Sequence, residues 1–420
     1  MPVSVPFFTN RQLSIALTEP VVILRGNPRD PVTNILRGEV ELVLTKPMSA
    51  SSITIQFVGQ SRMLWPEGIG SRGMKLMHEK KIHEQELVLM SAQDDQIKQI
   101  LGIGLHRWPF EFLLPNNLAD TIEDEMAKTN YSLQVMVNRP NGQSKLRCRR
   151  NVLVLSTMSS SDASLESHSL PSPSITTSRH MDLCDVALCV ETSIASSGTL
   201  FPITLTVNPN TKQVHLESFS VILNERRVYR LPEYDVRRSE ENDFKVKLST
   251  ATSMIDPSLA IEDVSMTQLR RVVSTKNAHI KIGANSFQYR FMFTLPNCVE
   301  VNHSTNFHEI LIRHRLRIQI ELTNGDEERR EVYFEVPITI LDCRLKEDYS
   351  ILPTYEEALL NPAFDEEGEK PGGFFVCPCY LAYQKKRRVN AKQEWIAFRN
   401  SSHKQNHAQP PPAYDEHTQD

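Results

Sequence analysis

The feature that most constrains the fold of this chain is an alternation of apolar and polar residues with a period of two, repeated along most of its length. Successive side chains of a β-strand point to opposite faces of a sheet, so this period is typical of strands with one buried face. Long runs with a helical period are scarce, and the sequence therefore predicts an all-β protein. The apolar members of the clearest runs are Val40, Leu42 and Leu44; Ile53, Ile55 and Phe57; Leu133, Val135 and Val137; Phe201, Ile203, Leu205 and Val207; Tyr289, Phe291, Phe293 and Leu295; Leu316, Ile318, Ile320 and Leu322; and Val332, Phe334, Val336 and Ile338.

These runs fall into two blocks separated by a polar segment. Residues 156–178 are rich in serine and contain Pro171 and Pro173, which is typical of a linker or an inserted loop. Each block is long enough for one immunoglobulin-like β-sandwich. We expect a lobe over residues 1–155, a linker over 156–180, a second lobe over 181–343, and a disordered tail over 344–420, where the alternation stops.

Local signals refine this outline. Asn141-Gly142 and Asn324-Gly325-Asp326 each lie between two apolar runs, and an Asn-Gly pair tolerates the positive φ that hairpin turns need. They predict hairpins. Residues 256–271 are the one segment with a helical pattern, with Leu259, Val264 and Leu269 on its inner face.

Charge and cysteine usage limit where such a chain works. Its formal net charge of -4 argues against a general nucleic-acid binder, which needs a basic excess. Its seven cysteines are scattered without a disulfide framework, which fits reduced thiols in the cytosol. Residues 1–17 lack the apolar run of a signal peptide, and residues 374–383 are about half the length of a membrane-spanning helix. We expect a cytoplasmic protein whose membrane contacts are peripheral.

Short proline-tyrosine motifs are the strongest functional signal. Pro411-Pro412-Ala413-Tyr414 and Leu352-Pro353-Thr354-Tyr355 lie in the predicted tail, and Leu231-Pro232-Glu233-Tyr234 lies in the second block. A proline in such a motif holds a polyproline II turn that fits between aromatic rings of a WW domain, and the tyrosine fills a second pocket. The motif is expected roughly 0.09 times by chance, and three copies occur. The two tail copies are the candidate WW ligands. The third is a weaker candidate because folded backbone can hide it.

Signatures of enzymes fail on inspection. Gly102-Ile103-Gly104 begins a nucleotide-binding pattern, but Arg107 stands where its third glycine belongs. His308-Glu309 resembles a zinc protease motif, but the second histidine is at 314 and the segment alternates like a strand; we expect His308 and His314 at the surface or a lobe edge. No nucleophile elbow is present. We therefore expect no catalytic residues, no metal and no cofactor.

One tail segment has the composition of a weak membrane contact. Cys377-Pro378-Cys379 lacks the spacing of a zinc site, but it lies between two phenylalanines and four adjacent cations. An anionic membrane surface would attract those cations, and acylation of a cysteine would strengthen the contact. The alternative reading is a solvated charge run. The candidate residues are Cys377, Cys379, Lys385, Lys386, Arg387 and Arg388.

Taken together, these segments resemble the α-arrestin family, in particular the fungal arrestin-related trafficking adaptors. The resemblance is carried by residues 21–65, 106–115, 288–296, 310–322 and 332–341, followed directly by the motif that ends at Tyr355. It implies two arrestin-like sandwich lobes and a tail that recruits a WW-domain HECT ubiquitin ligase. The implied cargo is a plasma-membrane transporter or receptor, which is ubiquitinated and then endocytosed. The implied location is the cytoplasm, peripherally at the plasma membrane and endosomes.

Two departures from the family pattern qualify that expectation. The linker is longer than two lobes need, so we expect Ser172 and Ser174, on either side of Pro173, to be regulatory phosphorylation sites. The polar-core and amphipathic-helix pattern of visual and β-arrestins is not evident, so we do not expect phosphate sensing of their kind. The nearest alternative is a sorting scaffold of the same fold, of the retromer type, acting without a ligase. A hydrolase with a β-sandwich appendage and an extracellular adhesion module are more distant alternatives.

Overall fold

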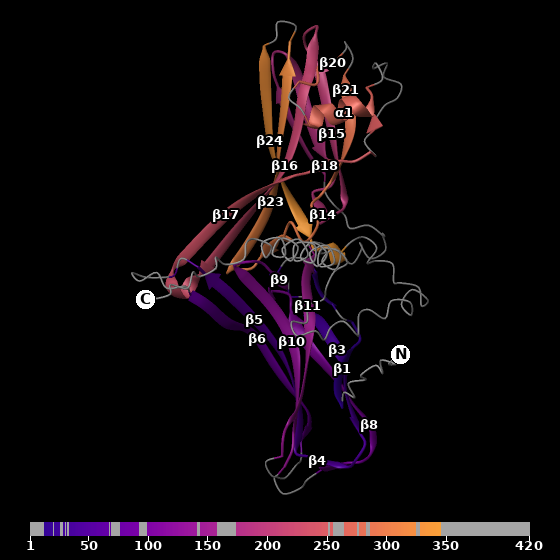
Figure 1. Ribbon diagram of the computed structural model, residues 1–420, viewed down its shortest axis with the longest axis vertical. Coiled ribbons are helices and arrows are strands. Elements are labelled where there is room, and N and C mark those ends of the chain that lie inside the picture. Colours follow the sequence, from indigo (N-terminus) through magenta and orange to yellow (C-terminus); the bar gives the residue numbers. More distant parts are fainter. Residues whose placement is uncertain are drawn as a thin grey trace, which may run out of the picture. The chain divides into compact units, whose positions relative to one another are not determined.

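The structure is a computed structural model of the 420-residue chain. It describes residues 12–345 except for 20, 26–27, 30, 32, 67, 69–75, 92–98, 141–142, 158–173, 251–252, 255–263, 275–276, 283–285 and 325–327. The described residues form two β-sandwich lobes, the first drawn in indigo to magenta and the second in pink to orange in Figure 1. The prediction of a two-lobe all-β fold is confirmed. The predicted disordered tail over 344–420 begins too early, because residues 344 and 345 belong to the 3-10 helix η3 (Cys343–Leu345) and Leu345 is buried. Residues 346–420 lie outside the described residues.

The N-terminal lobe packs a three-stranded sheet, in the order β1-β3-β8, on a larger sheet in the order β2-β11-β10-β5-β6. Strand β9 pairs with β10, and β4 pairs with β7 at one end of the lobe. The strands are β1 (Leu13–Leu17), β2 (Val21–Arg25), β3 (Thr33–Leu44), β4 (Met48–Ala50), β5 (Ser52–Trp65), β6 (Leu76–Ser91), β7 (Gln99–Leu101), β8 (Gly104–Pro115), β9 (Ile122–Glu123), β10 (Ala127–Asn138) and β11 (Leu146–Thr157).

The C-terminal lobe packs a sheet in the order β12-β13-β15-β21-β18 on one in the order β14-β24-β23-β16-β17. Strands β19, β20 and β22 pair at their margins, and helix α1 contacts β16. The elements are β12 (Ile175–His180), β13 (Cys184–Val190), β14 (Ile194–Ser196), β15 (Leu200–Pro209), β16 (Val214–Leu231), η2 (Pro232–Tyr234), β17 (Val236–Lys245), β18 (Lys247–Leu248), β19 (Ser253–Met254), α1 (Met266–Ser274), β20 (Ile280–Ile282), β21 (Phe287–Thr294), β22 (Thr305–Asn306), β23 (Ile310–Thr323), β24 (Arg329–Leu341) and η3 (Cys343–Leu345).

The two lobes repeat one topology. In each larger sheet a short strand, β2 or β14, runs parallel to the last long strand of the lobe, β11 or β24. The remaining neighbours correspond one to one, with β10, β5 and β6 in the places of β23, β16 and β17. The predicted hairpins are confirmed, since β10 pairs antiparallel with β11 and β23 with β24.

The alternating sequence explains the two cores. The apolar residues of every run named above are buried, and their neighbours in sequence point to the other face of the sheet. Aromatic rings fill the middle of each sandwich: Phe57 stacks on Tyr131 at a centroid distance of 5.5 Å in the first, and Phe219 lies 4.7 Å from Phe291 in the second.

Element boundaries differ from the sequence expectation in three places. Strand β11 continues to Thr157, and β12 pairs with β13, so residues 175–180 belong to the second lobe rather than to the linker. In the predicted helical segment, α1 begins at Met266 and ends at Ser274, with Leu269 and Val272 buried; Leu259 lies outside the described residues. Within the described residues, none of the helices has the length and apolar character of a membrane span.

Candidate functional site

Most residues predicted to bind partners lie outside the described residues. These are Leu352, Pro353, Tyr355, Pro411, Pro412 and Tyr414 of the tail motifs; Cys377, Cys379, Lys385, Lys386, Arg387 and Arg388 of the membrane candidate; and Ser172 of the linker. Ser174 is described and is exposed directly before β12. Among the described residues, the candidate site is instead the contact between the two lobes, where buried charged and apolar side chains of both lobes meet.

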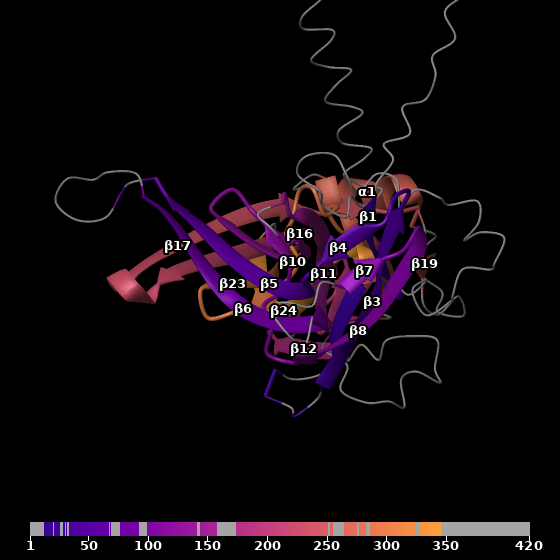
Figure 2. The same ribbon diagram turned by 90° about the horizontal axis from the view of Figure 1, so that it is seen from below.

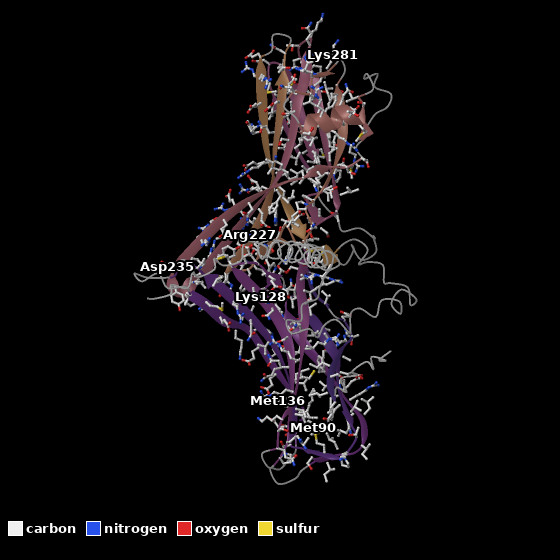
Figure 3. The ribbon with its side chains drawn as sticks, viewed as in Figure 1. Met90, Lys128, Met136, Arg227, Asp235 and Lys281 are labelled. Carbon is white, nitrogen blue, oxygen red and sulfur yellow. The ribbon has the colours of Figure 1, made fainter. Side chains whose placement is uncertain are left out.

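The third proline-tyrosine motif forms one end of that contact. Leu231 is the last residue of β16 and is fully buried, and Pro232 to Tyr234 form the 3-10 turn η2 that leads into β17. The amide of Asp235, at the end of this hairpin in Figure 3, donates to the carbonyl of Pro232 at 3.2 Å. A WW domain takes its ligand as an extended polyproline II segment. A 3-10 turn that buries Leu231 does not present one, which argues against this motif as a ligand.

The same hairpin end contacts strand β6 of the N-terminal lobe. Lys80 on β6 donates to Glu233 in the turn at 2.8 Å and to Glu309 at 3.0 Å, and these bonds raise the pKa of Lys80. The ring of His78 packs edge-on against Tyr234 at a centroid distance of 5.8 Å. Ser61 donates to the buried Glu309 at 3.1 Å. The turn therefore fixes one lobe against the other.

A buried charge cluster lies on β16 just before Leu231 in the sequence, at Arg227 in Figure 3. The Arg227 guanidinium donates to Asp124 of the N-terminal lobe at 2.7 Å and to Glu225 at 2.6 Å. The Tyr229 hydroxyl donates to the second oxygen of Asp124. The Asn302 amides donate to Asp124 at 3.1 Å and to Glu225 at 2.8 Å. One guanidinium thus joins a carboxylate from each lobe.

The pKa shifts favour a charged Arg227, an ionised Glu225 and a neutral Tyr229. Burial alone would lower the pKa of Arg227, but Asp124 and Glu225 raise it. Burial would raise the pKa of Glu225, but the hydrogen bond with His314 and the charge of Arg227 lower it. Burial and Asp124 both raise the pKa of Tyr229, so its phenol is a neutral donor. Removing one partner of such a buried ion pair leaves an uncompensated charge.

Two apolar clusters flank the charges. The first joins Met63 and Ile122 of the N-terminal lobe to Tyr229, Leu231 and Ile310 of the C-terminal lobe. The second brings the parallel strands β2 and β11 against Leu341 and Leu345, at the end of the described chain. Burial of apolar surface on both sides of the charge cluster stabilises the lobe contact.

A pocket of ≈ 830 Å³ lies between the lobes beside the charge cluster. Its walls include Asn116, Asp120, Thr157, Thr305, His314 and Thr339. Asp120 accepts from the Thr305 hydroxyl at 3.0 Å, and its other oxygen has no hydrogen-bond partner among the described residues. Within the described residues, no group of three His, Cys, Asp or Glu side chains is placed to hold a metal ion.

The two histidines expected at the surface or a lobe edge have different surroundings. His308 is exposed, 3.4 Å from Glu309. His314 is buried: its Nδ1 lies 2.8 Å from the Ser304 hydroxyl and its Nε2 3.2 Å from Glu225. The prediction of a surface or lobe-edge position is wrong for His314, because this residue lies in the interior of the contact between the lobes.

Comparison with known proteins identifies the fold. Residues 28–161 match the arrestin (or S-antigen) N-terminal domain, and residues 190–345 match the arrestin C-terminal domain. A relative in Schizosaccharomyces pombe, described as a putative arrestin-related trafficking adapter, is 26% identical over 88% of this chain. The chain belongs to the α-arrestin family. The resemblance seen in the sequence is confirmed.

Other relatives of this α-arrestin carry a more specific description. A protein of Neosartorya fischeri, described as a probable HECT-type ubiquitin ligase-interacting protein, is 23% identical over 79% of the chain. A second trafficking adapter of S. pombe is 21% identical over 83% of it. The chain spans 59% of the first S. pombe relative and 52% of the N. fischeri protein, so it corresponds to little more than half of either.

The charge cluster of this α-arrestin is the feature that sequence reasoning missed. Glu225 and Arg227 occupy the inward phase of β16, between Leu223 and Tyr229, where an apolar residue is expected. That break in the alternation was a usable signal for buried charge. Asp124 follows a two-residue strand and gave no comparable signal.

Proposed function

We propose that this α-arrestin links plasma-membrane cargo, in particular transporters, to a WW-domain HECT-type ubiquitin ligase, and so promotes cargo ubiquitination and endocytosis. The observation that carries the proposal is the pair of proline-tyrosine motifs that follow two arrestin lobes in the sequence, ending at Tyr355 and Tyr414. The description of one group of relatives as HECT-type ubiquitin ligase-interacting proteins supports it. In this role the protein is an adaptor and not an enzyme, and it needs no cofactor.

The two motifs suit a ligase that carries several WW domains. A single WW domain binds a short proline-tyrosine peptide weakly, because little surface is buried. When one motif is bound, the second is held near the next WW domain at a raised effective concentration. Tyr355 and Tyr414 are 59 positions apart in the sequence, and both sites therefore contribute to capture.

Location and regulation follow as parts of the same proposal. The adaptor works in the cytoplasm, peripherally at the plasma membrane and endosomes, where its cargo resides. The cations Lys385, Lys386, Arg387 and Arg388 add a weak attraction to anionic lipid, and an acyl chain on Cys377 or Cys379 would strengthen it. Phosphate on Ser172 or Ser174 would add up to about -2 charge per site and alter access to the ligase.

The alternative is a sorting scaffold that acts without a ligase, and one cell experiment separates the two. Transporter abundance at the plasma membrane is measured in cells that carry either the native chain or the Tyr355→Ala/Tyr414→Ala double variant. We expect specific transporters to accumulate at the surface with less attached ubiquitin in the variant, because the ligase is no longer recruited. Tyr333→Ala, at an exposed tyrosine on β24, is the matched control. Unchanged transporter levels in the double variant would support the scaffold.

A further inference from the structure

An exposed aliphatic patch lies at the end of the N-terminal lobe formed by β4, β7 and the first residues of β8, which Figure 2 views end-on. It consists of Val43, Ile100, Ile103 and Leu105, whose exposed fractions are 47%, 69%, 69% and 51%. We call it the tip patch. Single exposed aliphatic residues are common on soluble proteins, but four of them exposed at one end of a lobe indicate a contact surface.

Strand register explains how the tip patch arises. Val43 on β3 lies directly opposite Leu105 on β8, on the outer face of the three-stranded sheet. Further along that face, the outward positions are charged, as at Glu41 and Arg107, which form an ion pair at 3.1 Å. Leu101 faces the core, so its neighbour Ile100 points outward. The outer face is therefore aliphatic at the tip and charged along its middle, and it is aliphatic again at Ile35 and Leu113, at the far end of the strands.

The backbone around Ile103 holds this side chain away from the lobe. Gly102 and Gly104 flank it, and Gly104 has φ +125°, a conformation that other residues rarely adopt. A Cβ added at either glycine would meet no atom within 4 Å, so the loop projects into open space. Ile103 is thus presented outward by the local conformation of the chain.

The charge of the tip complements an anionic surface. The segments that meet there, residues 42–53, 99–106 and 136–147, contain the cations Lys46, Arg139, Lys145 and Arg147 and no carboxylate. None of these four cations forms an ion pair with another described residue. Residues 92–98, between β6 and β7 in the sequence, lie outside the described residues. They contain two aspartates and one lysine, so these four segments together have three more cations than carboxylates.

We propose that the tip patch is a peripheral contact of the N-terminal lobe with an anionic lipid bilayer. Aliphatic side chains on a projecting loop partition into the boundary between headgroups and acyl chains, and surrounding cations are attracted to an anionic leaflet. A lipid bilayer accounts for both features of the tip, its exposed aliphatic side chains and its surplus of cations, and the four patch residues include no aromatic side chain of the kind that anchors many protein interfaces. The contact uses the folded lobe and is independent of the tail motifs that bind the ligase.

The test is flotation of the full chain with vesicles of phosphatidylcholine alone or with about 30% phosphatidylserine, at low and physiological salt. The native chain is expected to bind the anionic vesicles, more strongly at low salt. Val43→Ser/Leu105→Ser and Ile103→Ser should each lower the bound fraction about fivefold at both salt concentrations, since they remove apolar insertion. Lys46→Ser/Arg147→Ser should lower binding mainly at low salt, because its effect is electrostatic.

The same two strands offer a matched control. Ile35 and Leu113 are also directly opposite each other on the outer face of β3 and β8, with exposed fractions of 40% and 57%, at the other end of these strands. Ile35→Ser/Leu113→Ser should leave vesicle binding unchanged. Thermal unfolding confirms that all variants are folded, and capture by a WW-domain protein, unchanged in the tip variants, separates this contact from ligase recruitment.

Three results would overturn the proposal. In the first, the tip variants bind anionic vesicles as well as the native chain does. All binding is lost instead in a variant in which four tail cations are replaced by serine: Lys385, Lys386, Arg387 and Arg388. The second is an equal loss in the control pair. The third is absence of vesicle binding by the native chain; if sedimentation then shows that Ile103→Ser abolishes self-association, a second copy of this chain covers the patch.

Discussion

Arg227 is the residue on which the contact between the lobes depends most. Replacing it with methionine keeps much of the apolar stem and removes the charge that Asp124 and Glu225 share. Two buried carboxylates would then lack their cation, and we expect a loss of about 3–5 kcal/mol in the free energy of unfolding. Urea unfolding measures it. Arg226→Met, at the exposed neighbouring position, should change stability by less than about 0.5 kcal/mol. Equal effects of the two substitutions would contradict this account.

His314 gives the lobe contact a pH dependence with a definite sign. Burial lowers the pKa of His314 in the folded protein, against the opposing effect of Glu225, whereas the unfolded value is about 6.5. As the pH falls below about 6.5, the unfolded chain takes up the proton first, so the free energy of unfolding decreases. His314→Gln should reduce this decrease between pH 7.5 and 5.5 in urea unfolding. His308→Gln, at an exposed position, should retain the native slope.

For single residues, the sequence predicted burial better than it predicted which side chains contact one another. Alternation identified the core positions because the side chains of a strand point to opposite faces in turn. The alternation marks Glu225 and Arg227 as charges on the inward face of β16, but it could not pair Arg227 with Asp124, because these two residues are 103 positions apart and meet only through the packing of two lobes. Leu231 illustrates the same limit: its motif is the weaker candidate ligand because folded backbone can hide it, and only the structure shows that its first residue is buried.

At the level of elements, close approach of β1 and β3 requires a glycine. A Cβ at Gly38 on β3 would lie 2.2 Å from the carbonyl oxygen of Ala16 on β1 and 2.9 Å from the ring of Phe110. The backbone oxygen can move away only if β1 shifts, so Gly38→Ala should cost about 1–3 kcal/mol of stability. Thermal unfolding measures the loss. Gly102→Ala is the control, since nothing lies within 4 Å of its added Cβ. A Gly38 variant as stable as the native chain would show that this approach is not tight.

The strands that the sequence did not predict show little difference in burial between their two faces. Strand β6 is 16 residues long, but its burial alternates only between half-buried and exposed, and its sequence is mostly polar. Strand β12 has a similar pattern, and its first residues fall within the polar, serine-rich segment 156–178 that predicts a linker. Both are edge strands, where one neighbouring strand and a partly covered face suffice for pairing. A period-two pattern identifies strands with one fully buried face, and the edge strands β6 and β12 lack such a face.

At the level of the whole molecule, the repeated topology explains how one chain builds two joined lobes. Two similar sandwiches meet through the β16–β17 hairpin, a shared ion cluster and two apolar patches. The order of two strand-rich blocks and a motif-bearing tail was visible in the sequence. The contact between the lobes was not, because it is formed by residues that are distant in sequence and come together only in the folded chain.

The central claim, recruitment of a ligase through two tail motifs, is tested most directly by the affinity of the full chain for a multi-WW fragment of a HECT ligase. Biolayer interferometry would compare the native chain with Tyr414→Ala, Tyr355→Ala and the double variant, with Tyr234→Ala as the control in the folded hairpin. Each single tail substitution should weaken binding by about 10²-fold or more through lost avidity, the double variant should bind barely at all, and the control should bind like the native chain. Undiminished affinity in the double variant would contradict the account.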